Sequence, residues 1–297
     1  MEPSSSALID LLKTALQYPL PHHLLSRLMF AATRVRSPPW KDRLIRRFIR
    51  HYGVDMGIAE EPDPARYPDF NSFFTRALCA RARPVIEDPR AIACPVDGTM
   101  SQVGDIRHGC LYQAKGRDYS LSQLLADDPQ LLDLFTDGKF MTLYLSPKDY
   151  HRIHMPLDGK LNKMIYVPGR LFAVNPPSAR VVPNLFARNE RLINLFEIAA
   201  GPMALIMVGA IFVGSMETVW AGRLTPASKR TLQVWYYDSE GSIPTCYAKG
   251  AEIGRFNMGS TVILLFSPHS MRWSPQLQPG AYVQMGQEIG RIEDCSP

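Results

Sequence analysis

Apolar side chains near the N-terminus recur at helical spacing. Three groups of them are spaced three and four residues apart, which places each group on one face of a helix. The groups are Leu8, Leu11, Leu12, Ala15 and Leu16; Leu24, Leu25, Leu28 and Met29; and Leu44, Ile45, Phe48 and Ile49. Prolines interrupt the pattern at residues 18–21 and 37–39. Residues 1–60 are therefore predicted to form several helices rather than one.

The pattern changes beyond residue 84. Short β-branched and aromatic runs alternate there with Gly, Pro and Asp turns, which is typical of many short strands. The runs are residues 140–145, 163–167, 204–213, 231–237 and 261–266. Glycines flanking apolar pairs at residues 280–291 suggest a tight hairpin.

Helices are also predicted at residues 69–78 and 120–135, and residues 60–64 are a predicted linker. We expect an α+β fold. N-terminal amphipathic helices would be followed by a β-rich core of short strands, a compact sandwich or barrel-like domain with one or two inserted helices. Residues 1–60 would form the helical segment and residues 61–297 the β-rich domain.

Positive charge is concentrated in the helical segment. Residues 1–52 hold nine Lys or Arg and three acids, a net charge of +6, whereas the remaining residues hold 24 bases and 25 acids. Basic amphipathic helices are typical of segments that lie on an anionic membrane surface. Ordinary packing on a core explains the pattern as well, and both interpretations stay open here. Nucleic acid is the less favoured anionic partner.

The longest apolar run, near residues 203–213, is about 11 residues, whereas a membrane-spanning helix needs about 18. The start of the chain, Met-Glu-Pro-Ser, lacks the basic n-region of a secretory signal, so none is expected. Five scattered cysteines predict free thiols in a reducing compartment. None pairs with a His at metal-ligand spacing, so no metal site is predicted.

Two segments carry candidate acid or base groups. Asp97 lies in the turn Cys-Pro-Val-Asp-Gly-Thr at residues 94–99, and Asp-Gly pairs are commonly structural. His151 and His154 lie three residues apart in a polar and aromatic segment. They are candidates for an acid–base pair, a metal pair or a structural pair.

A third segment contains a candidate nucleophile. Gly259 and Ser260 lead directly into an apolar run, and the residues that follow exclude the Gly-x-Ser-x-Gly nucleophile elbow. A second Gly-Ser pair stands at residues 214–215. The pattern alone does not choose between the two pairs.

A strained Gly-Ser bond beside a base can cleave itself. The serine hydroxyl attacks the preceding carbonyl and forms an ester, and loss of the serine α-proton expels that ester by β-elimination. Hydrolysis of the resulting dehydroalanine leaves a pyruvoyl group at the new N-terminus. A His would take the hydroxyl proton, and an Asp would orient that His. Glycine before the serine lowers the steric resistance.

These segments resemble the phosphatidylserine decarboxylase family. Met-Gly-Ser-Thr at residues 258–261 is similar to the family's Leu-Gly-Ser-Thr self-cleavage motif, with Met in place of Leu. The paired-histidine segment at 150–156 and the aspartate turn at 95–98 also match. Further matching stretches are residues 113–116, 167–169, 182–191 and 217–222. The resemblance runs from the N-terminal helices to at least Phe266, and the last 30 or so residues match loosely.

The resemblance implies a role for each candidate. Asp97, His154 and Ser260 would form the charge-relay triad for self-cleavage between Gly259 and Ser260. Ser260 would become a covalent pyruvoyl cofactor that takes the amine of phosphatidylserine as a Schiff base. CO₂ and phosphatidylethanolamine would be released, with His151 as the acid or base of decarboxylation.

The resemblance also implies a large chain, residues 1–259, that stays bound to a small pyruvoyl chain, residues 260–297. A homodimer is possible for the family. A phospholipid substrate favours the membrane interpretation of the helices, as a peripheral protein on the cytoplasmic face of the inner membrane. The rival is an Asp-His-Ser lipid esterase that uses the same three residues without self-cleavage.

Overall fold

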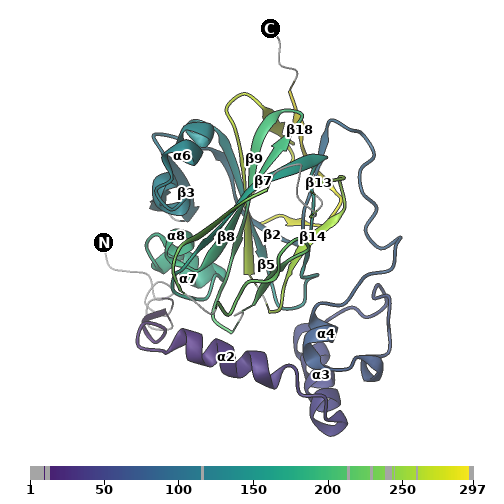
Figure 1. Cartoon of the computed structure of the whole chain (residues 1–297). Helices are drawn as coiled ribbons and strands as arrows, with labels where there is room; N and C mark the ends of the chain where they lie inside the picture. The colour runs from purple at the N-terminus through teal and green to yellow at the C-terminus, as the bar shows by residue number, and fades with distance from the viewer. Residues whose placement is uncertain are drawn as a thin grey trace.

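The computed structural model describes residues 10, 14–114, 117–212, 215–227, 230–237, 243, 245–258 and 260–293. The fold is α+β, as predicted: N-terminal helices precede a β-rich core. Figure 1 shows α2, α3 and α4 together at one end of that core. No helix within these described ranges is long and apolar enough to cross a bilayer.

The prolines divide the N-terminal segment as expected. Helix α2 spans His22–Ala32, and α3 spans Pro38–Tyr52. Gly53 ends α3 with a left-handed φ of 66°, which glycine adopts without strain. A 3₁₀ turn, η1 (Pro64–Arg66), follows the predicted linker. Helix α4 (Phe70–Phe74) is shorter than predicted and begins at Asp69, whose side chain accepts from an N–H of its first turn.

A nine-stranded sheet forms the centre of the core. Its antiparallel path runs β12-β7-β8-β9-β15-β5-β2-β17, with β13 beside β7. The strands are β2 (Gly98–Asp105), β5 (Lys139–Leu145), β7 (Gly159–Val167), β8 (Arg191–Ile198), β9 (Gly201–Val208), β12 (Gln233–Tyr236), β13 (Cys246–Tyr247), β15 (Ser260–Phe266) and β17 (Tyr282–Val283). Each of the five predicted strand runs overlaps one of them, although Val213 lies outside the described residues.

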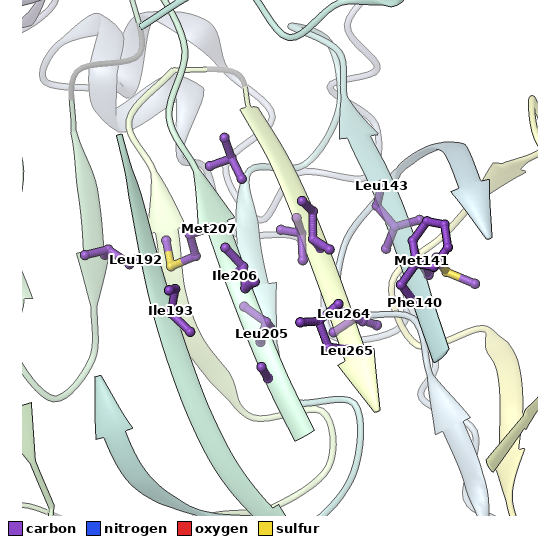
Figure 2. Close-up of a cluster of buried hydrophobic side chains, with 14 of the residues drawn as sticks. Phe140, Met141, Leu143, Leu192, Ile193, Leu205, Ile206, Met207, Leu264 and Leu265 are labelled. Carbon is purple, nitrogen blue, oxygen red and sulfur yellow. The ribbon is translucent and has the colours of Figure 1, made fainter. Parts of the chain in front are cut away.

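The middle strands of this sheet are buried on both faces. Residues 203–208 of β9 and 262–266 of β15 are all buried. Figure 2 shows the side chains of β8, β9, β15 and β5 packed in one cluster, with Leu264 of β15 between Leu205 of β9 and Met141 of β5. Because both faces are covered, these strands are continuous apolar runs rather than alternating ones.

Three smaller sheets complete the core. One has the order β11 (Gly222–Arg223), β10 (Met216–Thr218), β14 (Glu252–Phe256) and β6 (Arg152–His154). Another has the order β1 (Ala91–Ala93), β18 (Glu288–Ile292) and β16 (Met271–Trp273), and β3 (Cys110–Ala114) pairs with β4 (Arg117–Ser120). All of these are open sheets.

Four short helices lie among the described strands, where one or two were expected. They are α5 (Leu121–Leu124), α6 (Pro129–Phe135), α7 (Pro176–Val181) and α8 (Leu185–Arg188). The helix expected at 120–135 is divided because Ala126 and Asp127 have positive φ values of 61° and 57°. Asp128 then caps α6, with Pro129 in its first turn.

The predicted C-terminal hairpin is wrong. Strand β17 pairs with β2, whereas β18 pairs with β1 and β16 in another sheet. The turn between them is tight, and Gly286 has a φ of 86°. This turn is held by Cys94, which exchanges backbone hydrogen bonds with Gly286 and Gln287, so the two strands diverge instead of pairing.

The N-terminal helices have a small core of their own. It consists of Ile45, Val54, Tyr67, Phe70, Phe73 and Phe74. Met258 packs against both this cluster and the main core. The helices therefore contact the segment that precedes Ser260. The domain division at residue 60 stays a prediction.

We expect Gly98→Ala to destabilise the protein and Gly104→Ala to be tolerated. A Cβ at residue 98 would lie 2.5 Å from the backbone carbonyl oxygen of Tyr144 on β5, whereas one at residue 104 would lie 3.7 Å from the ring of Phe140. Both glycines lie on β2, where Gly98 pairs with Val283 of β17 and Gly104 pairs with Phe140 of β5. Overpacking costs about 1–3 kcal/mol. Equal urea midpoints for the two variants would contradict this close approach.

Candidate active site

The candidate site is formed by two connecting segments, or crossings, that run between the same two sheets. Strand β15 pairs with β5 in the central sheet, and β14 pairs with β6 in the four-stranded sheet. The segment from β5 to β6 contains both histidines, and the segment from β14 to β15 contains Gly259. The strands at the two ends of one segment pair with the strands at the two ends of the other segment. The two crossings therefore lie side by side. Distant parts of the sequence are thereby brought together.

Asp97 stands at the start of β2 and is buried. Arg83 donates to both carboxylate oxygens, with Nε 2.8 Å from Oδ1, and the backbone N–H of Met285 donates to Oδ1 at 2.8 Å. This is a bidentate pair with an added backbone donor, which stabilises the ionised carboxylate. Among the described residues, Asp97 makes no hydrogen bond to His154.

His154 has different partners. Its Nδ1 lies 2.8 Å from the carbonyl oxygen of Gly250, and its Nε2 lies 3.0 Å from the hydroxyl of Tyr150. A carbonyl only accepts, so Nδ1 carries the proton and Nε2 is left as an acceptor for the tyrosine O–H. Burial lowers the pKa of His154, while the field of Asp97 acts in the opposite direction. The ring is thus a neutral base whose basic nitrogen is Nε2.

His151 is fully buried and stacked on Phe74 of α4, with ring centroids 4.1 Å apart. Neither ring nitrogen has a hydrogen-bond partner among the described residues. The carbonyls of Pro147 and Ser146 lie nearby and favour the charged ring, but they do not meet hydrogen-bond geometry. Burial, reinforced by the positive charge of Arg76, lowers the pKa of His151 to about 3.

The proposed cleavage point is described in part. Gly259 lies outside the described residues, and Ser260 is described by its backbone, which pairs with Leu145 as the first residue of β15. Asn257 holds the segment that precedes this cleavage point in place. Its side-chain amide donates to Ser215 Oγ at 2.8 Å and to Glu217 Oε1 at 3.0 Å, and its backbone N–H donates to the Ser215 carbonyl.

The second Gly-Ser pair thus has a structural contact at the site. Gly214 is outside the described residues, but Ser215 is buried and holds Asn257, three residues before Ser260. This contact agrees with a structural interpretation of residues 214–215.

Four polar residues around the candidates were not predicted from the sequence. Arg83 binds Asp97, Tyr150 binds His154, and Asp149 accepts from the Ser146 N–H and the Tyr282 hydroxyl. The fourth, Arg76, is buried next to His151. Tyr150 and Asp149 lie within the histidine segment, so their position next to the histidines in the sequence could have identified them. Arg83 and Arg76 had no distinguishing pattern.

Burial raises the pKa of the Asp149 carboxyl, and the charge of Asp97 acts in the same direction. The two carboxylates therefore have different environments. Asp97 is paired with a guanidinium, whereas Asp149 has neutral hydrogen-bond donors.

An apolar cavity of about 190 Å³ opens where the helices meet the core. Phe48 and Tyr52 of α3, Phe74 of α4 and Met258 contribute to its lining. A polar cavity of about 230 Å³ is lined in part by Asp97 and by Tyr150 of the histidine segment. The described residues thus include a neutral histidine base, a buried carboxylate and an apolar cavity that Met258 lines just before β15.

Two family models match the chain. The model described as phosphatidylserine decarboxylase matches residues 70–291, and a model described as PSD matches residues 12–53. The first match extends through the C-terminal stretch that resembled the family loosely.

Curated relatives cover nearly the whole chain, and each is named phosphatidylserine decarboxylase proenzyme. A relative from Ectopseudomonas mendocina is 53% identical over 277 residues, covering 93% of this chain and 96% of its own length. One from Bordetella petrii is 51% identical, covering 94% and 96%. One from Pseudomonas aeruginosa is 52% identical, covering 91% and 93%.

The burial of neutral His151 predicts a pH-dependent stability. Its folded pKa of about 3 lies below the value of 6.5 for an exposed His, so between these values the unfolded chain binds a proton that the folded chain does not. The stability that the folded protein gains from keeping His151 neutral is fully present above pH 6.5 and is lost as the pH falls toward 3. The free energy of unfolding should fall by about 1.4 kcal/mol per pH unit from this group.

Urea unfolding at pH 7 and pH 5 tests this, with Ser260→Ala in every chain to keep it intact. His151→Leu should flatten the pH dependence, whereas the exposed-site control His51→Leu should not. Parallel curves for His151→Leu and its parent would show that His151 is not a buried neutral group.

Proposed function

The chain belongs to the phosphatidylserine decarboxylase family, and on that basis we propose that it is a pyruvoyl-dependent phosphatidylserine decarboxylase that cleaves itself between Gly259 and Ser260. The observation that carries the proposal is the pairing of the two crossings. It brings the histidine segment alongside the segment that leads into Ser260, with the His151 carbonyl accepting from the Phe256 N–H and with His154 opposite Glu252 on β14.

His154 is proposed as the base of self-cleavage. It would accept the hydroxyl proton of Ser260 as the oxygen attacks the Gly259 carbonyl carbon and the C–N bond breaks. The ester forms, loss of the Ser260 α-proton expels the Gly259 carboxylate, and water converts the remaining dehydroalanine to pyruvoyl with release of ammonia. Asp97 contributes through its field, which favours the protonated His154 that develops during attack.

The site fits a pyruvoyl group at the start of β15. This strand begins next to the apolar cavity, and the buried His151 has two unpartnered ring nitrogens among the described residues. When formed, the pyruvoyl group supplies a carbonyl that condenses with the amine of phosphatidylserine and accepts the electrons released with CO₂.

His151 is proposed to return a proton to the decarboxylated carbon. The neutral ring must first take up a proton, and burial opposes this in the free chain. An anionic headgroup beside the ring favours the imidazolium and raises the pKa of His151. Binding of the substrate would therefore prepare the acid that the reaction needs.

Helix α2 supports a membrane role for the N-terminal segment. Its buried residues are His22 and Ser26, while Leu24 and Leu28 are 56% and 59% exposed. His22 and His23 face loop backbone of the core, with His23 Nε2 2.9 Å from the Gly169 carbonyl oxygen. The polar side thus packs inward and the apolar side faces outward, opposite to a helix that covers a core.

Other exposed apolar residues of this segment extend the surface. They are Leu16, Leu20, Val35 and Trp40. We infer that this face docks on the anionic cytoplasmic surface of the inner membrane, and that the exposed arginines add electrostatic attraction there. The lipid would enter the apolar cavity beneath α3 and α4.

Ser260→Ala and His154→Ala should each leave the chain uncut. The first removes the nucleophile and the second removes the base. Intact mass spectrometry under denaturing conditions should show two chains for the wild type, residues 1–259 and residues 260–297, the smaller one blocked at its N-terminus. A single chain of 33.4 kDa is expected for each variant.

His151→Leu is the matched control, since it changes the other buried histidine of the same segment. This variant should be cut normally but should release CO₂ from phosphatidylserine much more slowly. Efficient cleavage of His154→Ala would exclude His154 as the base, and an uncut wild-type chain with esterase activity would favour the rival function.

The double variant Leu24→Asp/Leu28→Asp should lose membrane affinity. Each leucine contributes roughly 1.5–3 kcal/mol when buried in lipid, so binding should fall at least about 100-fold. Co-sedimentation with phosphatidylserine–phosphatidylcholine vesicles measures this, with Leu232→Asp, also an exposed leucine, as the control. Equal binding of both variants would place the membrane contact elsewhere.

A further inference from the structure

Arg76 is a buried cation without a carboxylate partner among the described residues. Its side chain belongs to a residue that is 3% exposed, and its Nη2 donates to the Lys148 carbonyl at 3.2 Å. Nε and Nη1 have no hydrogen-bond partner within the described part of the chain. An unpaired buried charge is costly, so unused donors on a guanidinium call for an explanation.

Arg76 lines the polar cavity of about 230 Å³. Lys148 lines the same cavity, is exposed, and forms no ion pair with a described carboxylate. The cavity volume is several times the roughly 30 Å³ that one water molecule occupies in the liquid. The guanidinium of Arg76 and the ammonium group of Lys148 thus border a space large enough for a polyatomic anion.

The acids of the cavity do not supply that anion. Arg83 occupies both oxygens of Asp97, Asp149 accepts from Ser146 and Tyr282, and Asp55 accepts from the Gly57 N–H. All three carboxylates favour the charge of Arg76 through their fields, but none lies within ion-pair distance of it. A ligand with two or more acceptor oxygens would fit the planar donor set of a guanidinium.

The cavity adjoins the proposed reaction centre. Tyr150 lines it and binds His154, while the charge of Arg76 acts on His151. In phosphatidylserine the phosphodiester is separated from the reacting carbon by one CH₂ and one oxygen. A phosphate group therefore falls close to the reaction centre in any productive pose.

The two anionic groups of this substrate differ in their fate. The carboxylate departs as CO₂, and an ion pair with it would stabilise the ground state more than the transition state. The phosphodiester keeps its charge throughout, so binding it positions the lipid without raising the barrier. Phosphate is accordingly the better match for a fixed guanidinium.

We propose that Arg76 and Lys148 form the binding site for the phosphodiester of the lipid headgroup. Arg76 anchors the group inside the cavity, and Lys148 contributes charge at the rim. The assignment rests on the proposed function for the identity of the lipid. The anion site itself depends on the geometry of the cavity.

Binding to uncut Ser260→Ala protein tests the site without turnover. Glycerophosphoserine and inorganic phosphate are titrated separately, followed by calorimetry and ³¹P NMR. Arg76→Gln should weaken glycerophosphoserine binding at least 10-fold, Arg76→Lys should weaken it less, and Lys148→Ala should weaken it several-fold. Arg272→Gln, an exposed arginine on β16, should bind as the parent does.

In self-cleaved enzyme, Lys148→Ala and Arg76→Lys should raise KM for phosphatidylserine more than they lower kcat. Parent-like glycerophosphoserine binding by Arg76→Lys and Lys148→Ala would overturn the proposal even if Arg76→Gln fails to fold. Binding of inorganic phosphate in preference to glycerophosphoserine would overturn the headgroup assignment. If glycerophosphoserine binds as expected but the wild type releases no CO₂ from phosphatidylserine, the proposed function is refuted and the anion site is still supported.

Discussion

Strand β15 pairs with β5 along seven residues, and β14 pairs with β6, so two connections cross between the same sheets. Every other feature of the candidate site depends on this double pairing. A shift in either register would move the histidines away from the start of β15, because neighbouring residues on a strand face opposite sides. The buried apolar strands β9 and β15 hold that register, since a slip would expose side chains that are now fully covered.

Burial decides the protonation of the groups that this pairing brings together. Both histidines are neutral because a charged ring would lose its hydration. Asp97 is held by Arg83, while Asp149 accepts from the Ser146 N–H and the Tyr282 hydroxyl. A basic histidine nitrogen, a buried carboxylate and a guanidinium that has no carboxylate partner among the described residues thus coexist within one small region. Each is kept in its state by its own surroundings rather than by direct contact with the others.

The N-terminal helices serve the same region from outside. Phe74 of α4 stacks on His151, and Met258 packs between the aromatic cluster of the helices and the main core. Helix α2 places His22 and Ser26 against the core and Leu24 and Leu28 toward the exterior. The apolar cavity therefore adjoins the proposed cleavage segment, because Met258 lines that cavity together with residues of α3 and α4.

The sequence by itself determined the helical breaks at the prolines, the central strands and the segments around Asp97, His154 and Ser260, because these depend on local periodicity and short motifs. It did not determine which partners these residues have. Arg83, Tyr150 and Gly250 become partners through the tertiary structure, as does the divergence of β17 from β18. Periodicity also showed that α2 has an apolar face, but not that this face points outward. Local patterns report the spacing of side chains, whereas hydrogen bonds and burial depend on what distant segments bring alongside.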